Sequence, residues 1–208
     1  MQQESTPESE SQVPSQLDQE ALNNWFDERL EQKLRERAEA RTPQLSLIAT
    51  KGTLDMAYPP FILASTAAAL GWDVSCFFTF YGLNLLKKDL NLAVSPLGNP
   101  AMPMKMPFGP DWFKSVEWNI PNALSSNLPG FEKFATLMME RTIKEKGVAS
   151  IQELRALSIE AEVKIIGCEM TADLFGYDKA EFIDEVSEWV GAASFLSAAK
   201  DANICLFV

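Results

Sequence analysis

The sequence predicts an α/β protein: a Rossmann-like open parallel sheet of about five strands flanked by helices, with an N-terminal amphipathic helix. Two observations support this prediction. First, nearly continuous apolar runs such as WDVSCFFTF are typical of strands buried on both faces, as parallel sheets require. Second, these runs alternate with helical patterns through short turns, which is the order of a parallel α/β sheet. With 208 residues, 47% of them hydrophobic, the chain can form one ordinary core.

Residues 1–43 are predicted to lie outside the main domain. Residues 1–16 are mostly Gln, Glu, Ser and Pro, a composition that predicts disorder. Residues 16–41 show a helical pattern in which apolar side chains recur every four positions, at Leu22, Phe26, Leu30 and Leu34. We expect this amphipathic interaction helix to contact its own domain or a neighbouring subunit, and we expect Pro43 to end it.

The main domain, residues 44–208, opens with a strand, a helix and a second strand. LSLIAT is a β-type run, and Lys51-Gly52-Thr53 after it is a loop with a helix N-cap signal. The apolar helix FILASTAAALG ends at Gly71, and WDVSCFFTF is the second strand. A turn at Gly82-Leu83-Asn84 then leads into LLKKDL, which we expect to be helical.

Residues 95–130 break this regular pattern. The segment holds seven of the twelve prolines, together with Met102, Met104 and Met106. A stretch this long without periodicity is usually functional or disordered. Because its methionines and aromatic residues can bury themselves, we expect an ordered flap or a subunit contact.

Regular elements return in the second half of the chain. FEKFATLMMERTIKEKG predicts an amphipathic helix, and SIQELRALSIEA predicts another, opened by a capping box between Ser150 and Glu153. The strand VKIIG reaches Cys168, and the helix EMTADLFG follows. DKAEFIDEVSEWV supplies a helix and a short strand, and GAASFLSAAKDA and NICLFV close the chain as helix and strand.

Composition excludes several classes of function. The net charge of −11 disfavours nucleic-acid binding, which needs a basic face. The chain has no histidine, which excludes Ser-His-Asp triads, Cys-His pairs and the commonest zinc sites. Its three cysteines form no CxxC motif and are too scattered for a disulfide framework. We therefore expect no metal and no cofactor.

The same features bear on location. The polar, acidic N-terminus does not resemble a secretory signal or a transit peptide. No apolar run approaches the roughly 18 residues of a membrane span. We therefore expect a cytoplasmic protein with no membrane span, in a reducing setting that keeps a thiol free.

The three cysteines differ in their surroundings. Cys76 and Cys205 lie within apolar strands, and we expect both to pack in the core. Cys168 follows the strand VKIIG at the start of a helix, and open α/β sheets gather ligands and chemistry at the carboxyl ends of their strands. A helix N-terminus favours the thiolate that a nucleophilic or sulfur-carrying cysteine needs. Gly167 would allow a sharp turn and the close approach of a substrate.

Two features oppose this functional interpretation of Cys168. The adjacent Glu169 would disfavour a thiolate, and no histidine exists to act as a base. A purely structural role for Cys168 therefore stays open.

Several stretches resemble a known family, the DsrE/DsrF/DsrH-like sulfur carriers. GVASIQELRALSIEAEVKIIGCEMTADLFGYDKAEFIDEV is similar to the segment around their reactive cysteine, where a strand precedes Cys-x-Met-x-x-Asp-x-x-Gly. GTLDMAYPPFILASTAAALGWDVSCFFTFYGLNLLKK, NPAMPM and LPGFEKFATLMMERTIKEKGV agree as well, so that the resemblance covers about residues 45–207. The most similar branch is the one encoded with TusA-type carriers, often called peroxiredoxin-like.

The resemblance implies a fold, an activity and partners. The fold is Rossmann-like and commonly forms homo-oligomers (trimers, tetramers or hexamers). The reactive cysteine, Cys168 here, would accept sulfane sulfur or a thiosulfonate group and relay it to a TusA-type carrier or a similar protein. The chain would thus act in sulfur metabolism as a carrier or as a sulfurtransferase. Some relatives have a second functional cysteine eight positions away, where this chain has Glu160 and Gly176.

The candidate site extends beyond Cys168 to residues that we expect at the same sheet edge. They are Gly167, Glu169 and Met170, then Lys51, Gly52 and Thr53 after the first strand, and Tyr81, Gly82 and Asn84 after the second. Lys51 could offset the charge of an incoming sulfur anion, or it could be an ordinary solvated lysine.

Two other functions remain open at this point. One is a non-catalytic oligomeric assembly or binding module in which Cys168 only packs. The other is nucleotide binding at TKGTLD, although this loop lacks the glycine spacing of phosphate-binding motifs. A true peroxiredoxin is set aside, because no arginine lies between Arg41 and Arg141 or after Arg155 to assist such a cysteine.

Overall fold

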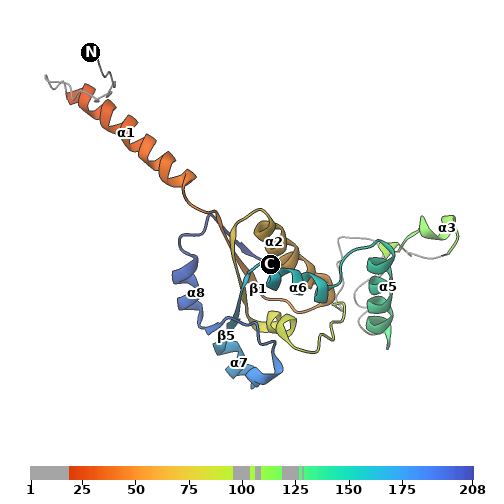
Figure 1. The fold of residues 1–208 in the computed structure, drawn as a ribbon. Coiled ribbons are helices and arrows are strands. Elements are labelled where there is room, and N and C mark those ends of the chain that lie inside the picture. The colour runs from red at the N-terminus through yellow and green to blue at the C-terminus, as the bar shows by residue number, and fades with distance from the viewer. Residues whose placement is uncertain (1–18, 96–103, 106–108, 119–126, 128) are drawn as a thin grey trace, which may run out of the picture. The chain divides into compact units, whose positions relative to one another are not determined.

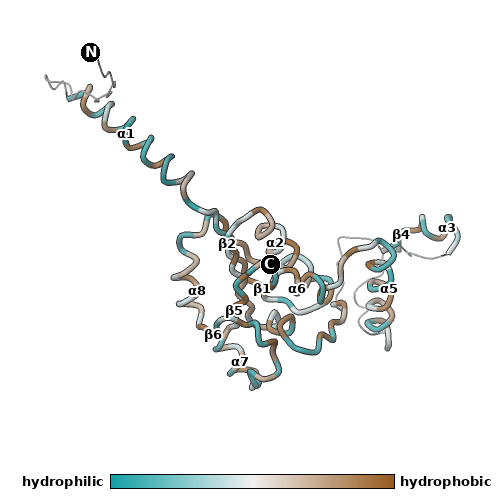
Figure 2. The backbone as a smooth tube through the Cα atoms, in the orientation of Figure 1, coloured by the Kyte–Doolittle hydropathy of each residue, from teal (hydrophilic) through white to brown (hydrophobic). Residues whose placement is uncertain are grey.

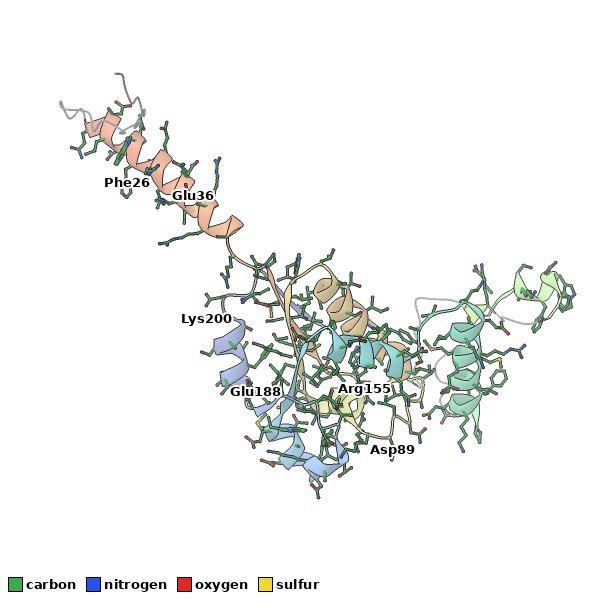
Figure 3. All side chains as sticks on the ribbon, viewed as in Figure 1. Phe26, Glu36, Asp89, Arg155, Glu188 and Lys200 are labelled. Carbon is green, nitrogen blue, oxygen red and sulfur yellow. The ribbon has the colours of Figure 1, made fainter. Side chains whose placement is uncertain are left out.

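The computed structural model describes residues 19–95, 104–105, 109–118, 127 and 129–208, and it divides into a unit of residues 1–42 and a unit of residues 43–208 (Figure 1). The first unit contains helix α1 (Gln19–Glu39), which confirms the helix predicted there. Most of its apolar side chains, including Phe26 (labelled in Figure 3) and Leu30, are exposed. The disorder predicted for residues 1–16 lies outside the described residues.

The second unit is built on the predicted parallel sheet. Five strands pair in the order β6-β5-β2-β1-β7, and every pair is parallel. They are β1 (Gln44–Ala49), β2 (Asp73–Phe78), β5 (Lys164–Cys168), β6 (Glu188–Val190) and β7 (Ile204–Phe207). The α/β fold class and the five parallel strands are thereby confirmed.

Helices cover the two faces of this sheet unequally (Figure 1). Helices α2 (Leu54–Ala69) and α6 (Ile151–Glu160) lie on one face, and α8 (Ala192–Ala199) lies on the other. The larger core packs under α2 and α6, where the strands are brown in Figure 2. Cys76 belongs to this core and is fully buried, as predicted, and burial raises the pKa of its thiol far above the ordinary value.

Local sequence signals explain most helix boundaries. Thr53 is the N-cap residue of α2, and Ser150 caps α6 through a complete capping box with Glu153. Helix α5 (Phe131–Glu145) also matches its prediction. Helix α2 starts seven residues earlier than Phe61, where we predicted it, and includes Pro59 and Pro60. Leu54 and Ala57 of its first turn are buried in the core, and this burial offsets the cost of the two prolines that follow.

The helix predicted at LLKKDL is wrong. The chain instead forms the 3₁₀ helix η1 (Phe80–Leu86) and becomes extended at Lys87. Leu83, Leu85 and Leu86 are all fully buried, so the short helix packs into the core rather than along a surface. Arg155 of α6 (Figure 3) stabilises the end of η1. The Arg155 guanidinium donates hydrogen bonds to the carbonyls of Leu85 (3.0 Å) and Lys87 (2.8 Å).

The prediction that Cys205 packs in the core is also wrong. Cys205 is an exposed free thiol, and all four residues of β7 are exposed. The reason is that β7 is an edge strand, which among the described strands pairs only with β1. An apolar sequence alone does not distinguish such an edge strand from a central strand.

The Met/Pro-rich segment is described only in part. It contains the short antiparallel strands β3 (Met104–Lys105) and β4 (Glu117–Trp118), with the one-turn helix α3 (Asp111–Lys114) between them. The rest of residues 95–130 lies largely outside the described residues, so the ordered flap stays a prediction. Among the helices that the structure describes, none is long and apolar enough to span a membrane.

Candidate functional site

The loops after β1 and β2 meet at the carboxyl edge of the sheet, as expected. A β-carbon on Gly52 would overlap the carbonyl oxygen of Tyr81, and one on Gly82 would overlap the carbonyl oxygen of Ala49. The two loops therefore touch through their backbones, and glycine is the residue that permits so close an approach. Lys51 and Tyr81 are exposed on this edge.

Helix α7 (Glu169–Phe175) is fastened to the same edge by Thr171. This side chain is buried, and its Oγ1 lies 3.1 Å from Oγ1 of Thr79, just after β2. The backbone N–H of Phe80 also donates to Thr171 Oγ1, at 3.4 Å. In addition, the hydroxyl of Tyr177 donates to Oδ1 of Asn84 at 3.5 Å. Hydrogen bonds thus join the segment after β5 to the loop after β2.

Cys168 stands at the junction of β5 and α7, as the last residue of the strand and the N-cap residue of the helix. Its thiol is free, only 1% of the residue is exposed, and its sulfur accepts no capping hydrogen bond from the helix. It packs in a small apolar cluster with Phe77, Ile166 and Phe195. The thiol is therefore at the predicted edge but turned under α8, away from solvent.

Gly167 supports the strand rather than a turn. It is buried within β5 and pairs in register with Trp189 of β6. A β-carbon on Gly167 would lie 2.6 Å from Cε3 of the Trp189 ring. Because successive side chains of a strand alternate between faces, this indole lies on the face opposite the Cys168 side chain. The approach of a substrate at Gly167 stays a prediction, and any such approach would come from the Cys168 side.

Glu169, the acidic residue next to Cys168, forms an ion pair with a lysine. Lys179, on the 3₁₀ helix η2 (Lys179–Glu181), places its Nζ 2.9 Å from Oε1 of Glu169. Both side chains are about half exposed, so the pair contributes little to stability. It does reduce the negative potential that a thiolate of Cys168 would experience. Sequence reasoning missed Lys179, because nothing in the spacing of ten residues predicts this contact.

Exposed apolar side chains of η1 and α7 lie at this edge. We call Phe80, Tyr81, Met170, Leu174 and Phe175 the edge patch; their exposed fractions run from 38% for Phe175 to 67% for Leu174. The rings of Tyr81 and Phe175 stack at 5.9 Å between centroids. Phe80 adopts a φ of 48°, a left-handed conformation that is costly for a bulky residue. Strain of this kind concentrates at functional surfaces.

The remaining predicted residues lie farther from the thiol. Thr53 begins α2 without a side-chain capping bond, and Lys51 makes no ion pair with any described residue. Strands β1 and β5 are separated by β2, which places the Lys51 loop about 10 Å from β5 by strand spacing. Among the described residues, no group of three or more cysteine, aspartate and glutamate side chains is placed to hold a metal ion.

The fold and the site together define a class of protein: an open parallel α/β sheet with a free cysteine where a central strand passes into a helix. Comparison with known proteins makes the assignment more specific. The DsrE/DsrF/DrsH-like family matches residues 41–207. The chain therefore belongs to this family, which confirms the resemblance seen in the sequence.

Two relatives match nearly their whole length. The chain is 58% identical over 166 residues to the protein named sulfur carrier protein DsrE2 of Allochromatium vinosum, covering 79% of this chain and 98% of that protein. It is 26% identical over 168 residues to the uncharacterized protein YrkE of Bacillus subtilis, covering 81% of this chain and 98% of that protein.

Proposed function

We propose that this protein is a sulfur carrier that holds sulfane sulfur or a thiosulfonate group on Cys168 and passes it to a partner protein. The observation that carries this proposal is the 58% identity to a protein named as a sulfur carrier, over 98% of that protein's length. The structure supports it with a free thiol at the sheet edge where α/β proteins carry their chemistry.

The chemistry would be a thiol exchange without net oxidation. The thiolate of Cys168 attacks the outer sulfur of a donor persulfide, R–S–SH. A bond forms between Sγ and that sulfur, the S–S bond of the donor breaks, and the donor leaves as the thiolate R–S⁻. With tetrathionate, the same attack on an inner sulfur leaves an S-thiosulfonate on Cys168 and releases thiosulfate. Handing the sulfur to an acceptor thiolate reverses the first exchange.

Residues around Cys168 would assist in two ways. Backbone N–H groups at the start of α7 would stabilise the thiolate or an attached sulfonate. Lys179 would keep the charge of Glu169 from opposing that thiolate. Lys51, exposed on the same edge, would attract an anionic donor. Turnover as a sulfurtransferase and stoichiometric carriage both fit this arrangement.

The partner would be a TusA-type carrier or a similar sulfur-relay protein that docks on the edge patch. Apolar side chains at the centre of such a contact contribute most of its affinity. Leu174→Glu, at an exposed position one turn from Met170, should slow transfer to the carrier by roughly tenfold or more. Loading by small donors should not change. Equal slowing by Leu137→Glu, an exposed leucine on α5, would show that the patch has no special role.

A homo-oligomer is part of the proposal, with the edge of β7 as the contact. The backbone N–H of Val208 donates to the carbonyl of Ile48 in β1, and its carbonyl accepts from the N–H of Thr50 just after β1. The backbone groups of Phe207, one residue earlier, therefore point away from the sheet. Phe207 is 72% exposed. Exposed apolar edges are normally covered in native proteins. Light scattering should therefore show an oligomer for the protein and a smaller species for Phe207→Lys.

We also place the protein in the cytoplasm, where its three free thiols would stay reduced. A second candidate function, a non-catalytic assembly module, is favoured by the burial of Cys168 in an apolar cluster. The two functions differ in what Cys168 does when it meets a sulfur donor.

Loading by small donors tests the proposal. The reduced protein is incubated with thiosulfate, tetrathionate and glutathione persulfide in turn, and its tryptic peptides are examined by mass spectrometry. We expect a sulfur or thiosulfonate adduct on the Cys168 peptide that dithiothreitol removes. Adducts confined to the exposed Cys205, with none on Cys168 even from a loaded TusA-type carrier, would instead favour the assembly module.

A further inference from the structure

The enclosure of Cys168 raises a question of access. Thiol exchange requires the second sulfur to reach Sγ directly, and access controls its rate. Along β5, Ile165 belongs to the core under α2 and α6, whereas Ile166 and Cys168 belong to the cluster under α8. With the residue only 1% exposed, neither a donor nor an acceptor reaches Cys168 in this conformation.

The helix that covers this cluster packs on it mainly through one large side chain, with a smaller contribution from Ala199. Phe195 is the only buried residue of α8, and its ring stacks on Phe77 with centroids 4.6 Å apart and planes within 11°. Its neighbour Leu196 is 57% exposed. Figure 1 shows α8 on the side of strands β1 and β5 that faces away from α2 and α6. Elements with few buried apolar contacts open at a lower free energy than the core does.

Space for such an opening exists beside the helix. A cleft of about 570 Å³ is lined in part by Ile166, Phe195 and Ala198, and it extends to the amino ends of β2 and β5, at Asp73 and Lys164. Two of these residues, Ile166 and Phe195, also belong to the cluster that encloses Cys168. Gly191 precedes the helix, and a turn that begins at Lys200 (Figure 3) follows it, so both ends lie next to non-helical backbone. Because Phe77 and Phe195 belong to the smaller cluster, separation of their rings would leave the contacts of the larger core under α2 and α6 in place.

We propose that α8 is a lid over Cys168 and that Phe195 is the access-controlling residue that holds it closed. The inference rests on the proposed function, since it concerns the cysteine that would carry the sulfur. The closed state shields a bound persulfide from water-borne thiols and oxidants. Local opening of α8, which docking of a partner would favour, exposes it for transfer.

The labelling rate of Cys168 can be compared with the rates of the two other cysteines in the same protein. The native protein is alkylated with iodoacetamide, and the labelling of each cysteine peptide is followed by mass spectrometry. Cys205 is exposed in the single chain and should react fastest in the Phe207→Lys protein, in which the proposed contact at β7 is broken, whereas Cys76 lies in the large core and should react only on global unfolding. Cys168 should react at an intermediate rate that reports opening of α8, and this rate needs no sulfur donor.

Variants of α8 identify the lid. Phe195→Ala should raise the labelling rate of Cys168 by roughly tenfold or more, because the buried ring that closes the helix is lost. Leu196→Ala, the exposed neighbour, should leave it unchanged. Phe195→Leu, which keeps an apolar side chain, should give a smaller increase and serves if Phe195→Ala does not fold.

Three results would overturn the inference. In the first, Cys168 is labelled as fast as Cys205. In the second, Cys168 is labelled only as slowly as Cys76. In the third, Phe195→Ala and Leu196→Ala change the labelling rate of Cys168 equally. Failure of the proposed function would look different, because Cys168 would then open and alkylate as described yet accept no sulfur from any donor.

Discussion

Replacing Cys168 by alanine or serine is expected to abolish loading with sulfane sulfur or thiosulfonate. Cys168 is the one thiol at the junction of a central strand and a helix, whereas Cys76 is sealed in the core and Cys205 lies on the edge strand. The fold should survive both substitutions. Alanine keeps the cluster around Phe77 apolar, whereas a serine hydroxyl there should cost roughly 1–3 kcal/mol of unfolding free energy.

The control for this prediction is Cys205→Ser. That substitution removes the most accessible thiol and should leave the Cys168 adduct at the wild-type level. Intact-mass measurements on the three variants report how much adduct each one carries. Urea denaturation reports their stability independently. A reducible adduct of normal yield in a folded Cys168→Ala protein would contradict the assignment of the carrier residue.

Gly82→Ala is expected to lower the unfolding free energy by about 3 kcal/mol or more. The added methyl group would overlap the carbonyl oxygen of Ala49 and lie 2.8 Å from its carbonyl carbon. These are backbone atoms of a central strand, so no side-chain rotation relieves the overlap. The same carbonyl accepts the hydrogen bond from the N–H of Thr79, which a shift of the loop would break.

The matched control is Gly191→Ala, before α8. Its φ is −79° and nothing lies within 4 Å of the added carbon, so the change should stay within about 0.5 kcal/mol. Urea unfolding followed by tryptophan fluorescence compares the two variants. Similar midpoints for both would mean that the loops after β1 and β2 do not meet as described.

The sequence predicted those features that local patterns determine. The apolar runs fixed which segments are strands, and the capping box at Ser150 marked the start of α6. The position of Cys168, at the end of a strand and the start of a helix, followed from the same local signals. The motif around Cys168 then identified the family, because its residue types recur at set spacings.

The remaining features depend on contacts between distant segments. Cys205 looked like a core residue because its strand is apolar, but edge position is set by which strands pair. The pairing of Lys179 with Glu169 depends on the course of the chain after α7. Strand alternation does not say which face α8 would cover, so the burial of Cys168 under Phe195 was not predictable either.

Transfer of labelled sulfur from Cys168 to an acceptor tests the central claim most directly. The protein is loaded with ³⁴S-labelled glutathione persulfide, freed of donor and mixed with a reduced TusA-type carrier. Peptide mass spectra of both proteins are then taken over time. We predict that the label leaves the Cys168 peptide as it appears, in equal amount, on the cysteine of the carrier. Label that stays on Cys168, or a carrier loaded only when free donor is present, would contradict the account.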